Sequence, residues 1–290
     1  MRLETIVSTG VIGISIGAQY ALISIGFTLI FGIMGVVNFA HGAFYIIGGY
    51  FAYTLTSLLG APFIFAVVLA TFLTALVGYF VEIIVVEKYV SDHMATMLLT
   101  LGVYQIMVTG ATLAYGAEPV DFRFPISGAL RWHGYFVPYS TLVVLVVCAV
   151  AIVSIYYLVF MTRYGIALRA MADDGAVARA QGIPAARMFP MAFAIATGLA
   201  GLTGAIVTPI LVLEPQGGEA ILGKAFIVVI LGGLGSVTGA TASAFIVGLI
   251  EAYSSVYLGG SKGALALFVL VVLILLVRPQ GLIGSSARKA

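Results

Sequence analysis

The sequence contains little charge, and this scarcity sets its class. Its 290 residues include 13 Lys or Arg and 11 Asp or Glu, so that 8% are charged, against roughly 25% in soluble globular domains. Hydrophobic residues make up 62% of the chain, and the mean hydropathy is +1.19. A soluble globule of this length needs far more polar surface. The net charge of +2 is not gathered into a basic face, so we expect no nucleic-acid partner.

The sequence also lacks the residue sets that build disulfides and metal sites. Cys148 is the only cysteine, so no disulfide can form within the chain. The histidines, His41, His93 and His133, stand far apart and offer none of the spacings typical of metal ligands. We therefore expect neither a metal nor another cofactor in this chain.

Long apolar runs fill most of the sequence. A helix needs about 20 apolar residues to cross a hydrocarbon core of roughly 30 Å. Eight or nine runs are candidates, of which the seventh and ninth are short: residues 11–34, 39–59, 62–86, 94–115, 138–161, 189–213, 221–234, 237–258 and 264–277. The sequence therefore predicts an all-α, polytopic helical membrane protein with eight to nine membrane segments, surrounded by membrane lipid. No linker divides the chain, so we expect a single transmembrane domain over residues 1–290.

Small residues are expected to hold these helices together. Glycine lets membrane helices approach closely, where packing replaces the hydrophobic effect. The chain has 35 glycines, and Gly198, Gly201 and Gly204 recur every third residue within the run 189–213. We interpret this face as a packing surface rather than a ligand site.

A short polar island, residues 163–187, interrupts the apolar sequence. Its charged residues are Arg163, Arg169, Asp173, Asp174, Arg179 and Arg187. Nearly everything else is suited to a bilayer, so the island is where a water-soluble protein can bind.

The distribution of Lys and Arg predicts an orientation, because basic residues gather in inner loops. The polar island holds four arginines, and the C-terminal tail holds Arg278, Arg288 and Lys289, so both are predicted inside. The loop 87–93 then also lies inside, and the outer loops are 118–133, 214–224 and 259–263. The N-terminus is outside if there are nine spans, and inside if there are eight or if the first hairpin is re-entrant.

The polar island is predicted to contain a short helix. Asp173 or Asp174 is suited to cap its start, Gly182 to end it, and Pro184 to prevent its continuation. About two turns remain, Gly175 to Gln181, which is too short to be stable alone.

This short helix therefore needs a surface to pack against. Ala176, Val177 and Ala180 lie on one side of it, with Arg179 beside them. That small apolar face can dock onto the helix ends of the same chain, or into a groove on a soluble partner that moves it. The sequence leaves both readings open.

Two glycine-rich interruptions resemble each other. Aligning residues 30–53 with 230–253 gives nine identities, and in both windows an apolar segment enters and leaves a glycine-rich break. Paired interruptions of this kind indicate a transport pathway, although apolar sequences also match by chance. The residues predicted for a pathway or gate are Gly35, Asn38, His41 and Gly42 in the first break, and Gly235, Ser236, Thr238 and Glu251 in and after the second.

Asn38 is the only asparagine in the chain, and His41 follows three residues later. One interpretation is a helix break whose polar groups face a pathway. The other is a tight turn between helices, for which Asn and Gly supply the backbone angles. A turn at the mouth of a pathway satisfies both.

Other residue patterns suggest rival functions. Glu82 and Glu251 fall within apolar runs, where carboxylates are costly, and either is a candidate proton site in an ion-coupled secondary transporter. The alternative is a hydrogen-bonded clamp between helices, which the lack of a dense relay of Asp, Glu and His favours. Glu82 lies near the inner end of its run, close enough to pair with Lys88. Ser236 and His41 are a weaker candidate pair for an intramembrane serine hydrolase.

One match to a nucleotide-binding motif is interpreted as coincidence. Residues 218–224 read G-x-x-x-x-G-K, the pattern of a phosphate-binding loop, and end at Lys224 in a predicted outer loop. Ala225 stands where that loop needs Ser or Thr for magnesium. We therefore expect no ATP hydrolysis by this chain.

The chain resembles the LivH-type permeases, the membrane subunits of ATP-binding-cassette importers for branched-chain amino acids. The matching stretches are 20–23, 27–45, 167–174, 182–183, 231–236 and 278–282. They occur in the expected order from end to end. The family also includes importers of urea, amides and aromatic acids, which these motifs do not separate.

The resemblance implies a fold related to type II importers, with the protein multi-pass in the bacterial cytoplasmic (inner) membrane. It implies a homologous LivM-type permease subunit forming a heterodimer with this chain, two cytoplasmic LivG/LivF-type ATPases that hold ATP and magnesium, and a periplasmic or extracellular substrate-binding protein. The chain itself is then not an enzyme. By this similarity the polar island contacts an ATPase, through Ala172, Asp173, Asp174, Ala176, Val177, Arg179, Ala180 and Gly182.

Overall fold

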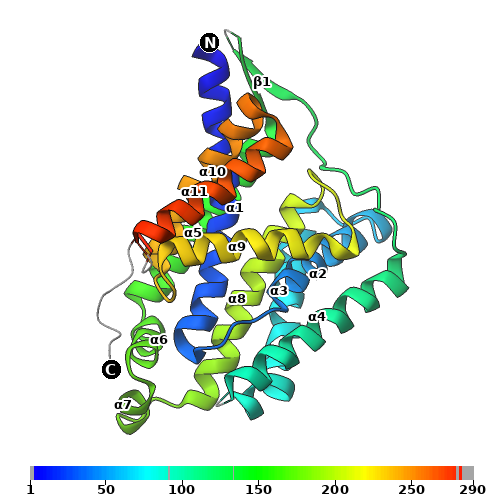
Figure 1. The fold of residues 1–290 in the computed structure, drawn as a ribbon. Coiled ribbons are helices and arrows are strands. Elements are labelled where there is room, and N and C mark those ends of the chain that lie inside the picture. Colours follow the sequence, from blue (N-terminus) through cyan, green and yellow to red (C-terminus); the bar gives the residue numbers. More distant parts are fainter. Residues whose placement is uncertain (1–2, 91, 133, 279–280, 283–290) are drawn as a thin grey trace. The chain divides into compact units, whose positions relative to one another are not determined.

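The computed structural model describes residues 3–90, 92–132, 134–278 and 281–282 (Figure 1). It is mainly helical. Its α-helices are α1 (Leu3–Met34), α2 (His41–Tyr53), α3 (Phe63–Val81), α4 (His93–Tyr115), α5 (Tyr139–Met161), α6 (Arg163–Asp173), α7 (Gly175–Ala180), α8 (Ala185–Val207), α9 (Gly218–Gly232), α10 (Val237–Leu258) and α11 (Gly260–Val277). Short π-helical turns η1 (Thr54–Leu58) and η2 (Glu82–Val86) follow α2 and α3. The 3-10 turns are η3 (Glu87–Tyr89) and η4 (Pro215–Gly217).

Each of the nine predicted apolar runs contains a helix. In the described part of the chain, seven helices are long and apolar enough to cross a membrane: α1, α3 with its extension to Tyr89, α4, α5, α8, α9 with η4, and α10. The prediction of a polytopic helical membrane protein is therefore confirmed. Helix α2 has only 13 residues, and within α11 the apolar stretch searched is Lys262–Ile274, so a count of eight to nine segments stays a prediction.

A short β-hairpin was not predicted. Strands β1 (Ala129–Trp132) and β2 (Tyr135–Pro138) pair antiparallel, with Leu130 opposite Val137. Gly134 in the turn has a φ of +89°, which glycine adopts at no steric cost. The Phe136 N–H donates to the Ser8 hydroxyl at 3.2 Å, which ties the hairpin to the start of α1. A search for long apolar runs does not detect strands of four residues.

The chain divides into two compact units, each built from separate stretches of sequence. The first unit comprises Met1–Ile25, Phe124–Ile152 and Lys224–Ala290, and the second comprises Gly26–Arg123 and Val153–Gly223. Helices α1, α5 and α9 therefore contribute residues to both. The single domain over residues 1–290 stays a prediction.

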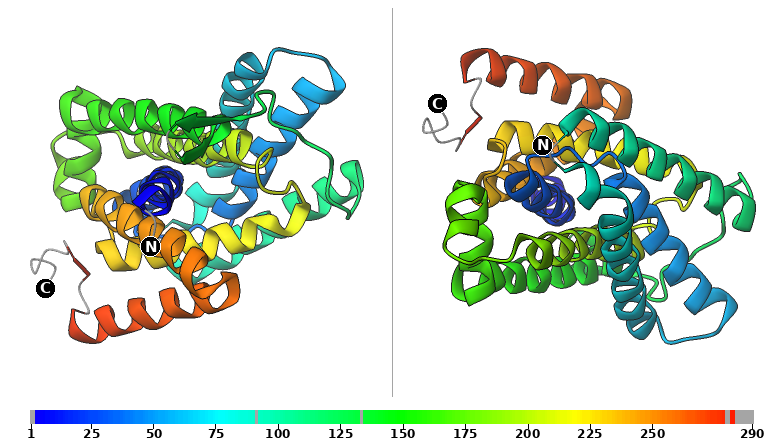
Figure 2. Two further views of the ribbon diagram at one scale, coloured as in Figure 1. Left: turned by 90° about the horizontal axis from the view of Figure 1, so that it is seen from above. Right: turned by 90° about the horizontal axis from the view of Figure 1, so that it is seen from below.

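In the second unit, α8 packs against α2 and α3 (Figure 2). A methyl group added at Gly204 would collide with the backbone oxygen of Tyr45 in α2. One added at Gly201 would lie 2.6 Å from the side chain of Thr74 in α3. The prediction that Gly198, Gly201 and Gly204 form a packing surface is thus confirmed, since small residues allow this close helix contact.

In the first unit, α10 packs closely on α1 and side by side with α11. A methyl group on Gly17 would lie 2.8 Å from the Phe245 Cα, and Gly248 approaches the backbone of Gly17 as closely. The Tyr253 hydroxyl donates to the carbonyl of Ile6 at 2.9 Å. Close packing of small residues therefore organises both units.

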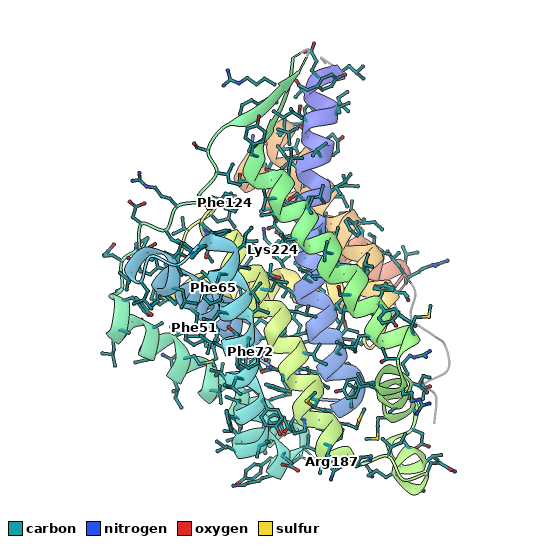
Figure 3. The ribbon with its side chains drawn as sticks, turned by 180° about the vertical axis from the view of Figure 1, so that it is seen from behind. Phe51, Phe65, Phe72, Phe124, Arg187 and Lys224 are labelled. Atoms are coloured by element: carbon teal, nitrogen blue, oxygen red, sulfur yellow. The ribbon has the colours of Figure 1, made fainter. Side chains whose placement is uncertain are left out.

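Large apolar side chains cover the outer faces of several long helices. Phe65 and Phe72 of α3 are more than half exposed (Figure 3). So are Leu113 of α4 and Tyr157 of α5. Such surface is suited to lipid or to another apolar subunit.

The predicted orientation receives one local test. The Val120 N–H donates to the Leu213 carbonyl at 3.0 Å, which joins two segments that the charge pattern assigns to the same, outer side. Arg288 and Lys289 of the tail, and also His133, lie outside the described residues. The orientation therefore stays a prediction.

Substitution of Gly204 by alanine is expected to destabilise the protein, because the added methyl group overlaps the Tyr45 backbone. Overpacking typically costs about 1–3 kcal/mol, so the apparent Tm in detergent should fall. Gly110→Ala in α4 is the matched control, because nothing lies within 4 Å of its added methyl group, and its Tm should stay the same or rise. Equal Tm values for the two variants would contradict the packing described for α8.

Candidate functional site

The first glycine-rich break is a buried, extended segment. Between α1 and α2, residues 35–40 are not helical, and Gly35 turns the chain with a φ of +69°. Burial then alternates: Val36, Asn38 and Ala40 are buried, whereas Val37 and Phe39 are partly exposed. Alternation of period two is typical of extended backbone with one covered face. The break is therefore an ordered part of the protein and not a surface loop.

Helix α2 begins beside the middle of two long helices. A methyl group added at Gly26 of α1 would lie 2.7 Å from the Ala196 carbonyl of α8 and 3.2 Å from the His41 ring. Gly26 is eight residues before the end of α1, roughly 12 Å along the axis. The chain thus turns back after α1, and α2 starts within the helical layer. Discontinuous helices of this kind form the binding sites of many transporters.

Asn38 organises the break. Its side-chain oxygen accepts from the Ala40 N–H at 3.0 Å, and its carbonyl accepts from the His41 N–H at 3.3 Å. The Phe39 N–H donates to the Thr100 hydroxyl at 3.2 Å. Asn38 is 1% exposed, and its Nδ2 has no hydrogen-bond partner among the described residues. The interpretation of Asn38 as a turn residue is therefore confirmed, whereas a pathway facing its buried donor stays a prediction.

His41 is wholly buried at the first residue of α2. Its ring meets Phe27 edge to face, with the centroids 5.8 Å apart. The next residue, Gly42, approaches the Gly218 carbonyl so closely that no side chain fits there. Gly35, Asn38, His41 and Gly42, predicted as one group, are thus brought together, and their role in a pathway stays a prediction.

The second break differs from the first. Gly233 and Gly235 turn the chain between α9 and α10, with φ values of +97° and +85°. Here Leu234, Gly235 and Thr238 are exposed, so this break is a tight turn. Both aligned windows, residues 30–53 and 230–253, contain a helix, a glycine with positive φ and a second helix. Whether they are a true repeat stays open.

Ser236 acts as a helix cap. Its hydroxyl accepts from the Gly239 N–H at 3.0 Å at the start of α10. This satisfies a backbone donor that the helix leaves unpaired. Neither this geometry nor any other contact of Ser236 favours the hydrolase alternative.

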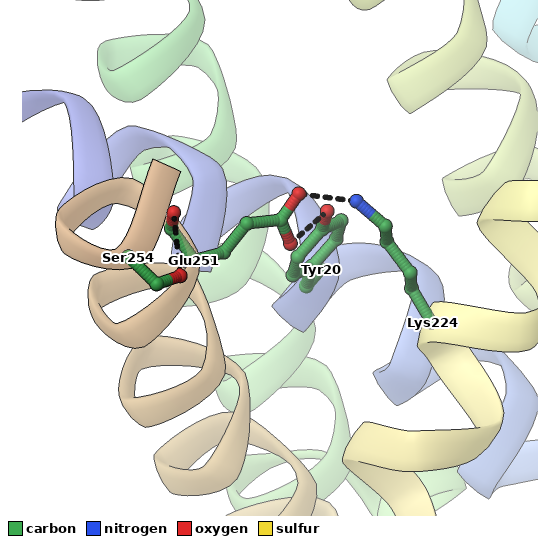
Figure 4. Close-up of polar contacts among 4 residues, drawn as sticks. All are labelled: Tyr20, Lys224, Glu251 and Ser254. Carbon is green, nitrogen blue, oxygen red and sulfur yellow. Dashed lines mark hydrogen bonds and ion pairs between the residues drawn. The ribbon is translucent and has the colours of Figure 1, made fainter. Parts of the chain in front are cut away.

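Glu251 lies far along α10 from the second break and belongs to a different group. It is 13 residues after Thr238 in the same helix, roughly 20 Å away. Its Oε1 pairs with the Lys224 ammonium, and its Oε2 accepts from the Tyr20 hydroxyl at 2.7 Å (Figure 4). The Lys224 ammonium also lies 5.3 Å from the centre of the Tyr20 ring. We call Tyr20, Lys224 and Glu251 the charged cluster.

Two predictions about charged residues were wrong. Lys224 was assigned to an outer loop, but it lies within α9, because Gly218 begins the helix six residues earlier. Glu82 was expected to snorkel or pair with Lys88. It is wholly buried in η2, and its oxygens have no partner within the described ranges, while Lys88 is exposed.

The polar island forms two helices in place of one. Helix α6, which was not predicted, is capped by the Thr162 hydroxyl, which accepts from the Gly165 N–H at 3.1 Å. The Tyr164 hydroxyl donates to the Met188 carbonyl at 3.3 Å, and burial raises the pKa of Tyr164. The Arg169 guanidinium lies 5.2 Å from the Phe160 ring centre. These contacts fix α6 to the end of α5 and the start of α8.

Helix α7 is the predicted two-turn helix, and Asp174 is its cap. One Asp174 carboxylate oxygen accepts from the N–H groups of Ala176 and Val177, at 2.9 and 3.0 Å. Gly182, with a φ of +86°, follows the end of the helix. Asp173 instead ends α6. The predicted cap and stop residues therefore act as their residue types suggest.

The exposed side of α7 contains most of the predicted contact residues. Ala178, which the sequence analysis did not single out, is the buried residue of α7, and the helix packs on α6. The members that stay exposed are Asp173, Asp174, Ala176, Val177, Arg179, Ala180 and Gly182, while Ala172 is half-buried. Helix α6 thus supplies part of the support that this short helix needs, and the predicted small face remains accessible.

Comparison with known proteins gives a consistent result. The sequence model of the family described as branched-chain amino acid transport system / permease component matches residues 11–278. The high-affinity branched-chain amino acid transport system permease protein LivH of Escherichia coli K12 is 29% identical over 289 residues, covering 94% of this chain and 93% of that protein. The corresponding permease protein BraD of Pseudomonas aeruginosa is 28% identical and covers 94% of each chain. A solved structure, PsaBC from Streptococcus pneumoniae in complex with Fab, aligns with a TM-score of 0.47 and 16% identity over 96% of this chain and 91% of that chain.

If the extended segment lines a water-filled pathway, cysteines on its partly exposed side should react with a membrane-impermeant thiol reagent. We expect labelling of Val37→Cys and Phe39→Cys, because the thiolate needed for reaction forms only in contact with water. Val36→Cys, at a position 2% exposed, and the native Cys148, which is fully buried, should stay unlabelled. Mass spectrometry of the labelled protein measures the difference, and equal inertness of all four thiols would remove this segment from the pathway.

Asp174 and Asp173 form a matched pair for testing the cap of α7. Asp174→Ala removes the acceptor for two backbone N–H groups, which should cost about 1 kcal/mol and speed hydrogen exchange over residues 175–181 several-fold. Asp173→Ala removes the same charge and leaves the cap in place, so exchange there should be unchanged. Equal exchange in both variants would mean that charge, and not capping, holds α7.

Proposed function

We propose that this chain, which belongs to the family of permease components of branched-chain amino acid transport systems, forms half of the transmembrane pathway of an ATP-driven importer. It is a multi-pass membrane protein and a permease component, not an enzyme. Its membrane is the bacterial cytoplasmic (inner) membrane, and its fold is related to that of type II importers, with eight to nine membrane segments. The second half of the pathway is a homologous, LivM-type permease subunit.

The observation that carries this proposal is the shape of the polar island. A capped, two-turn helix projects from a chain that is otherwise almost wholly apolar, and its small side chains Ala176, Val177 and Ala180 are exposed. Val177 is 55% exposed, although a helix this short depends on packing for its stability. A shallow groove on a soluble protein is suited to such a face, because small residues let backbones approach closely.

Two cytoplasmic LivG/LivF-type ATPases bind α7 in this proposal. ATP and magnesium are held by those partners, and this chain needs no cofactor of its own. When the ATPases close on ATP, they move α7, and α6 moves with it because the two helices pack together. Tyr164 and Arg169 then pass the movement from α6 to the neighbouring helices α8 and α5. The pathway beside the first break then alternates between outward and inward access.

The substrate reaches the outer side on a separate periplasmic or extracellular binding protein. We propose a branched-chain amino acid as the substrate, in keeping with the names of the related permeases LivH and BraD. The exposed apolar faces of α3, α4 and α5 supply the surface on which lipid and the second permease subunit pack.

Charging the small face of α7 should abolish coupling. Ala176→Glu places a carboxylate at a position that must be desolvated in the ATPase groove, and burying an unpaired charge costs several kcal/mol. We expect the ATPases to be lost on co-purification in mild detergent, or ATP-driven uptake to fall at least about tenfold. The spans should stay folded, because Ala176 is exposed in the isolated chain.

Ala117→Glu is the matched control, since Ala117 is also exposed but lies directly before the predicted outer loop 118–133. It should retain ATPase association and uptake. Unchanged association and uptake in Ala176→Glu would show that α7 is not the coupling helix.

A further inference from the structure

We propose that the charged cluster binds the ammonium and carboxylate groups of a zwitterionic α-amino acid. This inference rests on the proposed function and specifies the part of the substrate that is read. The cluster joins three helices of the first unit, with Tyr20 from α1, Lys224 from α9 and Glu251 from α10.

An ion pair at this place needs an explanation other than stability. Lys224 and Glu251 are only partly withdrawn from water, and even for fully buried ion pairs replacement by apolar residues is often neutral or stabilising. Among the described residues, salt bridges are otherwise found only at the exposed pair Arg123–Asp121. Charged residues retained within membrane segments usually mark a substrate or ion route.

The cluster is also accessible. The Lys224 and Glu251 side chains are 33% and 22% exposed, although both lie within apolar helices. Exposed charged groups such as these are costly in contact with lipid acyl chains. It is therefore expected to face an aqueous route, where a polar substrate reaches it.

The groups in the cluster are complementary to a zwitterion. Glu251 is the partner for an α-ammonium group, and Lys224 is the partner for an α-carboxylate. The Tyr20 hydroxyl already donates to Glu251 at 2.7 Å, and the Tyr20 ring already accepts a cation on its face, at 5.3 Å from Lys224. Tyr20 thus holds Glu251 in place through its hydroxyl, and its ring stabilises a positive charge beside Glu251.

Binding in this way exchanges one ion pair for two. The substrate ammonium takes the place of the Lys224 ammonium at Glu251, and Lys224 turns to the substrate carboxylate. Net charge in the membrane is unchanged, so no additional uncompensated charge is buried. A neutral amide or urea cannot replace both interactions, and a ligand with one charge leaves the other residue unpaired. The cluster therefore favours α-amino acids over the uncharged substrates of related importers.

The test is uptake by the complete complex in proteoliposomes, with its binding protein outside and ATP inside. The double variant Lys224→Met with Glu251→Gln removes both charges together and leaves no unpaired ion. Loss of two charge-assisted contacts should lower leucine uptake about ten- to hundredfold, while the subunits still assemble. The matched control, Arg123→Met with Asp121→Asn, removes the exposed ion pair and should transport as wild type does.

Wild-type uptake by the double variant would overturn the inference. If the double variant does not assemble, the charge reversal Lys224→Glu with Glu251→Lys keeps an ion pair between the same helices. Full uptake by that reversal would show that the pair is only a clamp, whereas an assembled reversal without uptake supports a site that orients its substrate. If the unmodified complex imports no amino acid, the proposed function fails. If it imports leucine and the double variant matches it, only the present inference fails.

Discussion

The structure depends on one constraint: within a bilayer, every backbone N–H and C=O group must find its partner in the protein. Helices meet this requirement without help, and the chain is accordingly almost all helix. A break between helices is tolerated only where other groups replace the missing bonds. The segment before α2 follows this rule, because Asn38 pairs with the Ala40 N–H and Thr100 with the Phe39 N–H. A single asparagine and a threonine from α4 thus permit the helical layer to be interrupted.

The same constraint explains why glycine positions the first break. Once the backbone is satisfied, helices in lipid associate through close packing and not through exclusion of water. Helix α8 presents Gly201 and Gly204 to its neighbours, so that α2 lies directly on its backbone. The start of α2 is then held against Gly26 of α1. The first break is therefore positioned by contacts between helix backbones at glycines, with almost no side chain between them.

Much of this could be predicted from the sequence, and the remainder divides by physical cause. Runs of apolar residues, the glycine face of α8 and the cap and stop of α7 are local signals, and each appears in the structure. Helix α6 was missed although its sequence contains the signal, because its buried residues Gly165, Leu168 and Met171 recur every third residue, as in an amphipathic helix. Ala178 was missed because its burial depends on α6. The pairing of Lys224 with Glu251 joins residues 27 apart on different helices, and Glu82 is buried by neighbours that no local pattern specifies.

The short connection after α7 has a mechanical consequence. Only Gln181, Gly182, Ile183 and Pro184 separate α7 from α8, and four residues span at most about 14 Å when fully extended. The Ile183 N–H donates to the Ala178 carbonyl, so the connection is folded back on α7 and cannot reach its full length unless this bond breaks. A displacement of α7 larger than the remaining slack pulls on α8, which is in direct backbone contact with α2. Such a displacement would reach the part of α8 where the Ala196 carbonyl lies against Gly26 of α1, next to the His41 ring at the start of α2.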